Sequence, residues 1–221
     1  MDRDMVGEHM HANLTDQIYE QLTDLFIAGE LRPGDVITER RMAERLKASR
    51  TPIREALGRL ETEGLVYKVP NRGVIVKPLS TEAFFDILEV RRLLEGETAY
   101  LAAGRLPKSR IEEIRSRLEA LKRTPEPTQA EVWNMDDFLH SQIAEATGNA
   151  LMAQMIRDLR RRIHVFNVYR NTLRAEYEFE ENERLLDAIE SGDGERARTA
   201  MIDHIDHIKR ALLERLAGKR R

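Results

Sequence analysis

Arg50 and Arg54 are residues whose type and spacing point to specific chemistry. Side chains four residues apart lie on one face of a helix, so these two arginines would project together. A guanidinium fork can donate two hydrogen bonds to guanine O6 and N7, or to a phosphate. Ser49 and Thr51 would lie at the start of the same helix, where hydroxyls and free backbone N–H groups suit a phosphate. The pattern predicts a nucleic-acid contact, and the alternative for each arginine alone is a surface salt bridge.

The charge distribution supports this interpretation. The 221 residues carry a net charge of −3, which by itself argues against nucleic acid. Residues 40–77, however, contain ten Lys or Arg and only four Glu. Because phosphate binding depends on a local patch and not on the whole-chain sum, this segment is a candidate interface. A solvated charged face is the alternative.

Composition limits the remaining chemistry. The chain has no Cys, so disulfides and thiolate metal sites are excluded, and a metal would need His, carboxylate or amide ligands. No apolar run approaches the roughly 20 residues that span a bilayer, and the first residues are acidic and polar. We therefore expect a cytoplasmic protein that does not bind membranes. A length of 221 residues predicts two domains.

The elements that would hold the arginines are short, and residues that favour caps and turns mark their ends. Periodicity predicts a helix over 13–29, a turn at 31–35, a second helix capped by Thr38 and a third helix capped by Ser49 and ended by Gly64. Residues 65–68 and 73–77 are β-rich and flank a turn. Two short helices followed by a hairpin predict a winged helix-turn-helix over residues 1–78. Arg72, beside Gly73 at the tip of the wing, could enter a minor groove.

The rest of the chain has a different character. A hinge at 78–81 precedes long helical segments at 80–104, 107–122, 129–147, 149–173, 176–191 and 194–217, separated by Gly and Pro. No fixed-period repeat is visible, so we predict an antiparallel all-α bundle over 79–221, within a mainly α protein.

The N-terminal motif resembles the DNA-binding domain of the GntR family. Ser49–Leu57 is similar to the family's recognition helix, with further likeness in Thr38–Leu46, Leu60–Val66 and Asn71–Val74. Lys47-Ala48 departs from the family, which often has Gly followed by a small apolar residue. The resemblance adds Arg40 as a reader of bases or backbone.

The C-terminal region resembles the FCD ligand-binding domain of the FadR branch, in its smaller VanR-like version. The matching stretches are Val90–Glu95, Asp136–His140, Gly148–Leu151, Ala188–Asp193, Ala197 and His204. The resemblance implies a bundle that binds a small molecule, with a carboxylate as the expected effector.

In metal-binding members of this family one Asp and three His converge on an ion. Asp136 and His140, at i and i+4, share a helix face here, and His204 occupies the last ligand position. The third position holds Asn182, whose amide oxygen is a weaker donor than imidazole. We expect Zn²⁺, Ni²⁺ or Mn²⁺ at this site. The alternatives are a shell completed by water or effector, a lost site, and ordinary hydrogen-bonded histidines.

Arg91 could offer its charge to the effector carboxylate, or pair with Glu95 at i+4. The resemblance implies a homodimeric repressor that binds a palindromic operator and is controlled by its effector. One alternative is a metal-dependent enzyme using Asp136, His140 and His204, although no H-E-x-x-H motif accompanies them. Another is a purely architectural DNA-binding protein, which would leave the polar residues of the bundle without a purpose.

Overall fold

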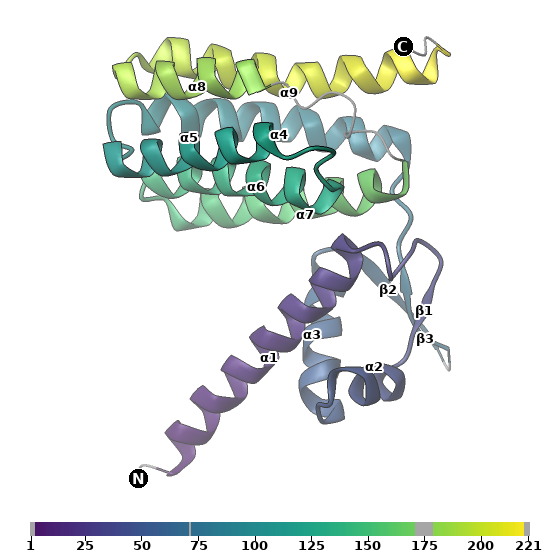
Figure 1. Ribbon diagram of the computed structural model, residues 1–221. Helices are drawn as coiled ribbons and strands as arrows, with labels where there is room; N and C mark the ends of the chain where they lie inside the picture. The colour runs from purple at the N-terminus through teal and green to yellow at the C-terminus, as the bar shows by residue number, and fades with distance from the viewer. Residues whose placement is uncertain (1–2, 71, 171–178, 219–221) are drawn as a thin grey trace. The chain divides into compact units, whose positions relative to one another are not determined.

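The segment before Leu79 contains both helices and short strands. The computed structural model describes residues 3–70, 72–170 and 179–218, and the chain divides into two units between Leu79 and Ser80. The first unit contains α1 (Arg3–Ile27), β1 (Val36–Ile37), α2 (Glu39–Leu46), α3 (Arg50–Thr62), β2 (Val66–Val69) and β3 (Gly73–Val76), as Figure 1 shows. Helix-turn-helix and wing are thus present, as predicted.

The core of this unit lies between α1, α3 and the sheet. Residues with almost no exposed surface come from all three, and they include Tyr19, Leu22, Phe26, Ile37, Ile53, Leu57, Leu60 and Val76. Tyr19 also donates its hydroxyl proton to Glu63 Oε2 at 2.6 Å, which ties α1 to the end of α3. The apolar face of α3 is therefore buried, which leaves its polar face outward.

Two features differ from the sequence prediction. The first helix begins at Arg3 and not near residue 13. The hairpin is also part of a three-stranded antiparallel sheet of order β1-β3-β2, in which Val36 and Ile37 pair with Ile75 and Val74. A two-residue strand has too little alternation to be recognised, so its pairing partner defines it.

The second unit is helical, as predicted. Its helices are α4 (Thr81–Ala102), α5 (Lys108–Arg123), α6 (Gln129–Ala146), α7 (Ala150–Arg170), α8 (Phe179–Ser191) and α9 (Gly194–Leu216). The predicted end of the fourth segment and start of the fifth fall in 171–178, outside the described residues. The mainly α fold, with a small sheet in the first unit, confirms the predicted class.

Helix α4 occupies the centre of the bundle and contacts α6, α7, α8 and α9. In Figure 1, α8 and α9 lie on one side of α4 and α5, and α6 and α7 lie on the other. The start of α9 lies close to α4. A Cβ added at Gly194 would be only 2.6 Å from the Tyr100 ring, so this contact needs glycine. This close packing brings residues of α9 next to residues of α4.

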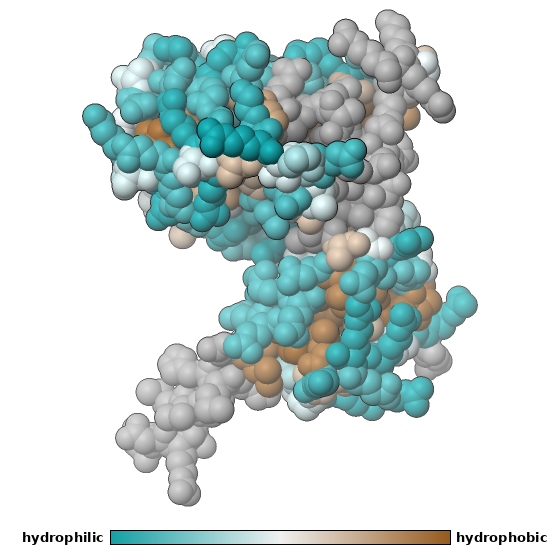
Figure 2. Space-filling view, in the orientation of Figure 1, coloured by the Kyte–Doolittle hydropathy of each residue, from teal (hydrophilic) through white to brown (hydrophobic). Residues whose placement is uncertain are grey.

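The face of the bundle seen in Figure 2 is mostly hydrophilic, with small hydrophobic spots. This agrees with a charged-residue content of 34%. Among the described residues, no helix combines the length and the apolar character needed to cross a bilayer.

Candidate nucleic-acid interface and candidate metal centre

Arg50 and Arg54 project from the exposed face of α3. Their side chains are 65% and 61% exposed, so both can reach a ligand in solvent. Both also bind one carboxylate, since Arg50 Nη2 donates to Glu39 Oε2 at 3.1 Å. Arg54 donates from Nε to Oε1 at 2.7 Å and from Nη2 to Oε2 at 2.9 Å. The salt bridge that was the alternative interpretation therefore exists, on side chains that remain accessible.

Glu39 lies in the first turn of α2, directly after Thr38. The Thr38 side chain accepts a hydrogen bond from Arg41 N, which fixes the start of the helix, as predicted. The two hydrogen bonds from Arg54 and the one from Arg50 outweigh partial burial and lower the pKa of Glu39 to about 2. Glu39 is therefore ionised at neutral pH, and a carboxylate charge lies between the two arginines.

The other side chains predicted to contact DNA are also exposed, at the starts of α2 and α3 and in the wing, whereas Gly73 is half-buried. Ser49 is the N-cap residue of α3, but its side chain makes no capping hydrogen bond, which corrects that prediction. Its hydroxyl is exposed beside Thr51. Arg40 is 84% exposed and lies 4.0 Å from Glu44 on the same helix. Arg72 is exposed at the wing turn.

Gly73 has a structural reason to be glycine. Its φ is +105°, and a Cβ there would lie 2.6 Å from the carbonyl oxygen of Ile37. A side chain would therefore clash with the backbone of β1, whatever the residue does toward a ligand.

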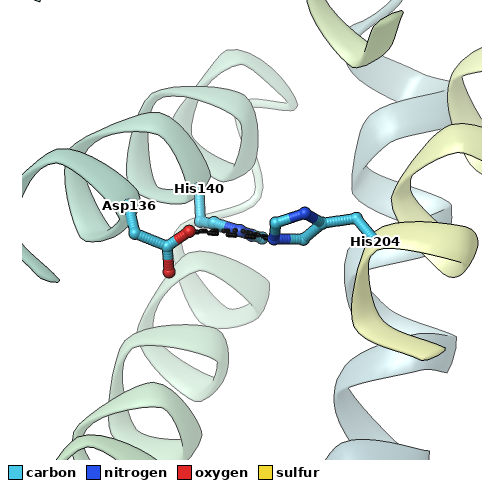
Figure 3. A group of neighbouring side chains, drawn as sticks. All are labelled: Asp136, His140 and His204. Carbon is cyan, nitrogen blue, oxygen red and sulfur yellow. Dashed lines mark hydrogen bonds and ion pairs between the residues drawn. The ribbon is translucent and has the colours of Figure 1, made fainter. Parts of the chain in front are cut away.

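The second group of side chains lies inside the helical unit. Asp136 and His140 come from α6 and His204 comes from α9, and Figure 3 shows the three pointing toward one another. The two Nε2 atoms are 3.3 Å apart. Asp136 Oδ1 lies 3.6 Å from His140 Nε2 and 3.7 Å from His204 Nε2. The structure thus brings together three of the four residues predicted as ligands.

Local signals place these residues. Helix α6 begins with a capping box, in which the Thr128 side chain accepts from Glu131 N and Glu131 accepts from Thr128 N. The side chain of Asp193 accepts from Arg196 N at the start of α9. The two caps fix where each helix starts, and the helical repeat then sets the direction of the three side chains.

A carboxylate faces the Nδ1 atom of each imidazole, on the side of the ring away from Asp136. His140 Nδ1 contacts Glu95 Oε2, and His204 Nδ1 lies 3.4 Å from Glu181 Oε2. A carboxylate facing Nδ1 favours the tautomer with the proton on that nitrogen. The lone pairs of both Nε2 atoms then point toward Asp136. In this tautomer three electron-rich atoms face one another, an arrangement that a cation among them would stabilise.

Arg160 of α7 balances the carboxylate of Asp136. It donates from Nη2 to Asp136 Oδ2 at 2.8 Å and from Nε to Asp137 Oδ1 at 3.0 Å. Burial opposes ionisation of Asp136, but Arg160 and the two histidines hold its pKa well below the usual range. Burial also opposes the charge on Glu95, and Arg91 and His140 outweigh it, so its pKa is lowered. Both carboxylates are therefore anionic in the interior.

In the absence of another cation, a proton on His204 supplies the positive charge. Burial alone would lower the pKa of His204. The carboxylates of Asp136 and Glu181 have the larger effect and raise this pKa to about 9. The same electrostatic environment that stabilises this proton would stabilise a divalent ion.

The donor set fits such an ion. Ligands about 2.0–2.2 Å from one centre lie about 3–3.6 Å from each other, close to the separations observed. The donors are one carboxylate and two imidazoles, the types that Zn²⁺, Ni²⁺ and Mn²⁺ accept. Each imidazole has a carboxylate on its far side, which is the usual support for a metal-bound histidine.

Three buried residues of the helical unit carry polar atoms without a partner among the described residues. Asn182 of α8 is buried and neither of its amide atoms has a hydrogen-bond partner among the described residues. Arg91 pairs with Glu95 through Nε, as one interpretation held, yet its Nη2 is also buried without a partner. Arg160 Nη1 is a third such atom. Buried donors without acceptors are costly, so these atoms indicate a polar ligand.

The sequence does not predict the roles of four residues of these sites. It indicates Glu95 only as a partner for Arg91, and the spacing of Glu39, Arg160 and Glu181 gives no signal. Each contacts a partner that is distant in sequence, from 11 residues for Glu39 and Arg50 to 45 for Glu95 and His140. No local pattern records such contacts.

Comparisons with known proteins agree with this architecture. Residues 86–207 match the FCD domain family, and residues 14–76 match the family described as bacterial regulatory proteins, gntR family. The Nta operon transcriptional regulator of Aminobacter aminovorans is 32% identical over 62% of this chain and 65% of its own length. The HTH-type transcriptional regulator LutR of Bacillus subtilis is 29% identical over 83% and 94%. The solved structure of E. coli McbR/YncC is similar with a TM-score of 0.81 and 25% identity, over 92% of this chain and 98% of that one.

Proposed function

The chain belongs to the GntR family of bacterial regulatory proteins and carries an FCD domain, and we propose that it represses transcription under the control of a small carboxylate bound near Asp136, His140 and His204. It is a DNA-binding transcriptional regulator, and the relatives named above are regulators and not enzymes. The convergence of these three donors inside the FCD unit is the observation that carries the proposal.

Operator DNA is recognised by α3 and its surroundings. Arg50 and Arg54 read base edges in the major groove, Ser49, Thr51 and Arg40 hold phosphates or bases, and Arg72 enters the minor groove. The exposure of these side chains supports this assignment.

Asp136, His140 and His204 would hold a divalent ion, with Asn182 as a weaker oxygen donor, and the bound ion would supply a Lewis-acidic position for a carboxylate oxygen. The free Nη2 of Arg91 and Nη1 of Arg160 would donate to the same carboxylate. Charged groups already in place would thus meet the charge of the effector, which favours a carboxylate over a neutral molecule.

The effect of effector binding is transmitted to the DNA-binding unit through α4. This helix carries Arg91 and Glu95, and only residues 77–80 separate its start from the end of β3. Binding that favours one placement of the DNA-binding units over another changes operator affinity by that difference in free energy.

The regulator acts as a homodimer on a palindromic site, because one recognition helix offers few base contacts and two-fold symmetry doubles them. Helices α4 and α7 pack against each other and carry large exposed apolar side chains, which supports a second copy at this face. The exposed apolar side chains are those of Val90, Leu93, Leu151 and Met155. Sedimentation of the full chain with and without Leu93→Glu measures this, and a monomeric wild type on DNA would refute it.

The decisive experiment measures DNA binding with and without carboxylates. Duplexes selected by the wild-type chain from a randomised pool are titrated in the presence of Zn²⁺ and a panel of mono-, di- and tricarboxylates. We expect at least one carboxylate to weaken binding. Arg50→Ala or Arg54→Ala should each cost roughly 1–3 kcal/mol of specific binding. Unchanged affinity in both variants would contradict the role of α3.

His140→Ala tests whether ligand binding by the helical unit can be lost without loss of DNA binding. It should abolish retention of Zn²⁺ and the response to carboxylates, and leave DNA binding without effector intact, because the DNA-contacting residues lie in the other unit. Asn182→His should tighten Zn²⁺ binding, since imidazole is the better donor. Protein prepared without chelators that contains no metal, and shows no thermal shift with Zn²⁺, Ni²⁺ or Mn²⁺, would contradict the metal site.

A further inference from the structure

Glu39 is the shared partner of Arg50 and Arg54, two of the arginines of α3. Its two carboxylate oxygens accept three hydrogen bonds, one from Arg50 and two from Arg54. The Glu39 side chain is 26% exposed, whereas the arginines are more than half exposed. The carboxylate is therefore less accessible to a ligand in solvent than the two guanidinium groups.

We propose that Glu39 is a positioning residue for DNA recognition, which holds Arg50 and Arg54 in one arrangement and so sharpens discrimination between sequences. This inference rests on the proposed role of the two arginines in reading DNA. Arg54 uses its Nε and Nη2 edge for Glu39, which leaves the Nη1 and Nη2 edge as a fork directed elsewhere. Among the described residues no acceptor binds Arg54 Nη1.

A fixed fork discriminates better than a free one. A mobile arginine can turn toward any phosphate, and phosphate binding is independent of sequence. An arginine whose second edge is already held loses less conformational freedom on docking, and it matches a base only where the acceptors are correctly placed. Glu39 also places a negative charge near the DNA, which lowers the affinity for phosphate in general.

Folding stability gives no comparable reason for this arrangement. Ion pairs between exposed side chains contribute little to stability, and both arginines are exposed. The start of α2 is already capped by Thr38. Two arginines directed by one carboxylate at the DNA-facing end of the motif are instead what recognition requires.

The test compares Glu39→Gln with Glu44→Gln in the full chain. Both variants remove one charge from α2, but Glu44 lies 4.0 Å from Arg40 and binds neither Arg50 nor Arg54. The probes are a duplex enriched by the wild-type chain from a pool with about 20 randomised base pairs, and a shuffled duplex of the same composition. Fluorescence anisotropy gives the two dissociation constants. The dissociation constant of the shuffled duplex divided by that of the enriched duplex measures discrimination.

Glu39→Gln should reduce this ratio about tenfold, through weaker binding of the enriched duplex and tighter binding of the shuffled one. Glu44→Gln should change the ratio less than about twofold. Glu39→Asp, which keeps the charge but is too short to bridge both arginines, should resemble Glu39→Gln and provides the same test if the latter does not fold.

Equal ratios in the wild type and both Glu39 variants would overturn the inference, and so would equal losses in Glu39→Gln and Glu44→Gln. These results differ from failure of the proposed function itself. In that case the wild type enriches no sequence, or Arg50→Ala and Arg54→Ala leave the ratio unchanged, and both the function and the inference fall.

Discussion

The Glu39 cluster consists of Glu39, Arg50 and Arg54, and the Asp136 cluster consists of Asp136, His140, His204 and the groups that bind them. Both contain carboxylate–arginine ion pairs, but the first is exposed and the second is buried. In the first, one carboxylate binds two arginines that are more than 60% exposed. In the second, Asp136 binds Arg160, whose side chain has no exposed surface. Water can replace a lost partner in the first cluster and cannot do so in the second. The exposed cluster is therefore held weakly but is accessible to DNA, whereas the buried cluster depends on its own ion pairs.

The largest test of this comparison removes the buried arginine. Arg160→Leu leaves Asp136 and Asp137 without their cation and should lower the free energy of unfolding of the helical unit by about 3–5 kcal/mol. Arg115→Leu removes an arginine that binds Glu183, Asp187 and Glu190 at the surface, and should cost about 1 kcal/mol or less. Urea unfolding followed by Trp133, the single tryptophan, measures both. Equal losses would contradict the contrast between the clusters.

A milder change tests the support of the metal centre. Glu95→Gln keeps the shape of the side chain but removes the charge that faces His140 Nδ1 and should weaken Zn²⁺ binding about 10–100-fold. Glu97→Gln is the control, because Glu97 binds Arg198 at 2.7 Å near the surface. Calorimetric titration with Zn²⁺ gives the two affinities. If the control weakens binding as much as Glu95→Gln, the support assigned to Glu95 is wrong.

The turn before α3 offers a smaller gain in stability. Lys47 ends α2 with φ 51° and ψ 41°, the left-handed region in which glycine is strained least. Lys47→Gly should raise the free energy of unfolding by about 0.5–1 kcal/mol, and Lys47→Ala should not raise it. The departure from the GntR pattern thus concerns backbone strain and leaves the turn in place. Thermal unfolding of the three proteins checks this, and a loss with glycine would show that the Lys47 side chain stabilises the turn.

The smallest expected effect is a pH dependence of the exposed cluster. Because the pKa of Glu39 is lowered to about 2 from an ordinary value of 4.5, its contribution to stability is full above pH 4.5 and is lost as the pH falls toward 2. The difference in stability between the wild type and Glu39→Gln should therefore shrink across this range. Acid titration of both proteins, followed by circular dichroism, measures the difference. A difference that stays constant with pH would mean that ionised Glu39 does not contribute.

Local sequence was sufficient for the elements and for part of each site. Thr38 and the glycines placed helix ends correctly, and the spacing of Arg50 and Arg54 placed both on the exposed face of α3. Such features depend on neighbours within one helical turn, so a short stretch of sequence contains them.

Contacts between distant residues were decided by tertiary packing alone. The pairing of β1, the bridge from Glu39 and the convergence of Glu95 and Arg160 on the Asp136 cluster all depend on where separate elements meet. For Arg91, sequence offered a choice between pairing with Glu95 and facing a ligand. Packing gave its Nε to Glu95 and left Nη2 buried without an acceptor, because a guanidinium has more donors than one carboxylate can bind in that space.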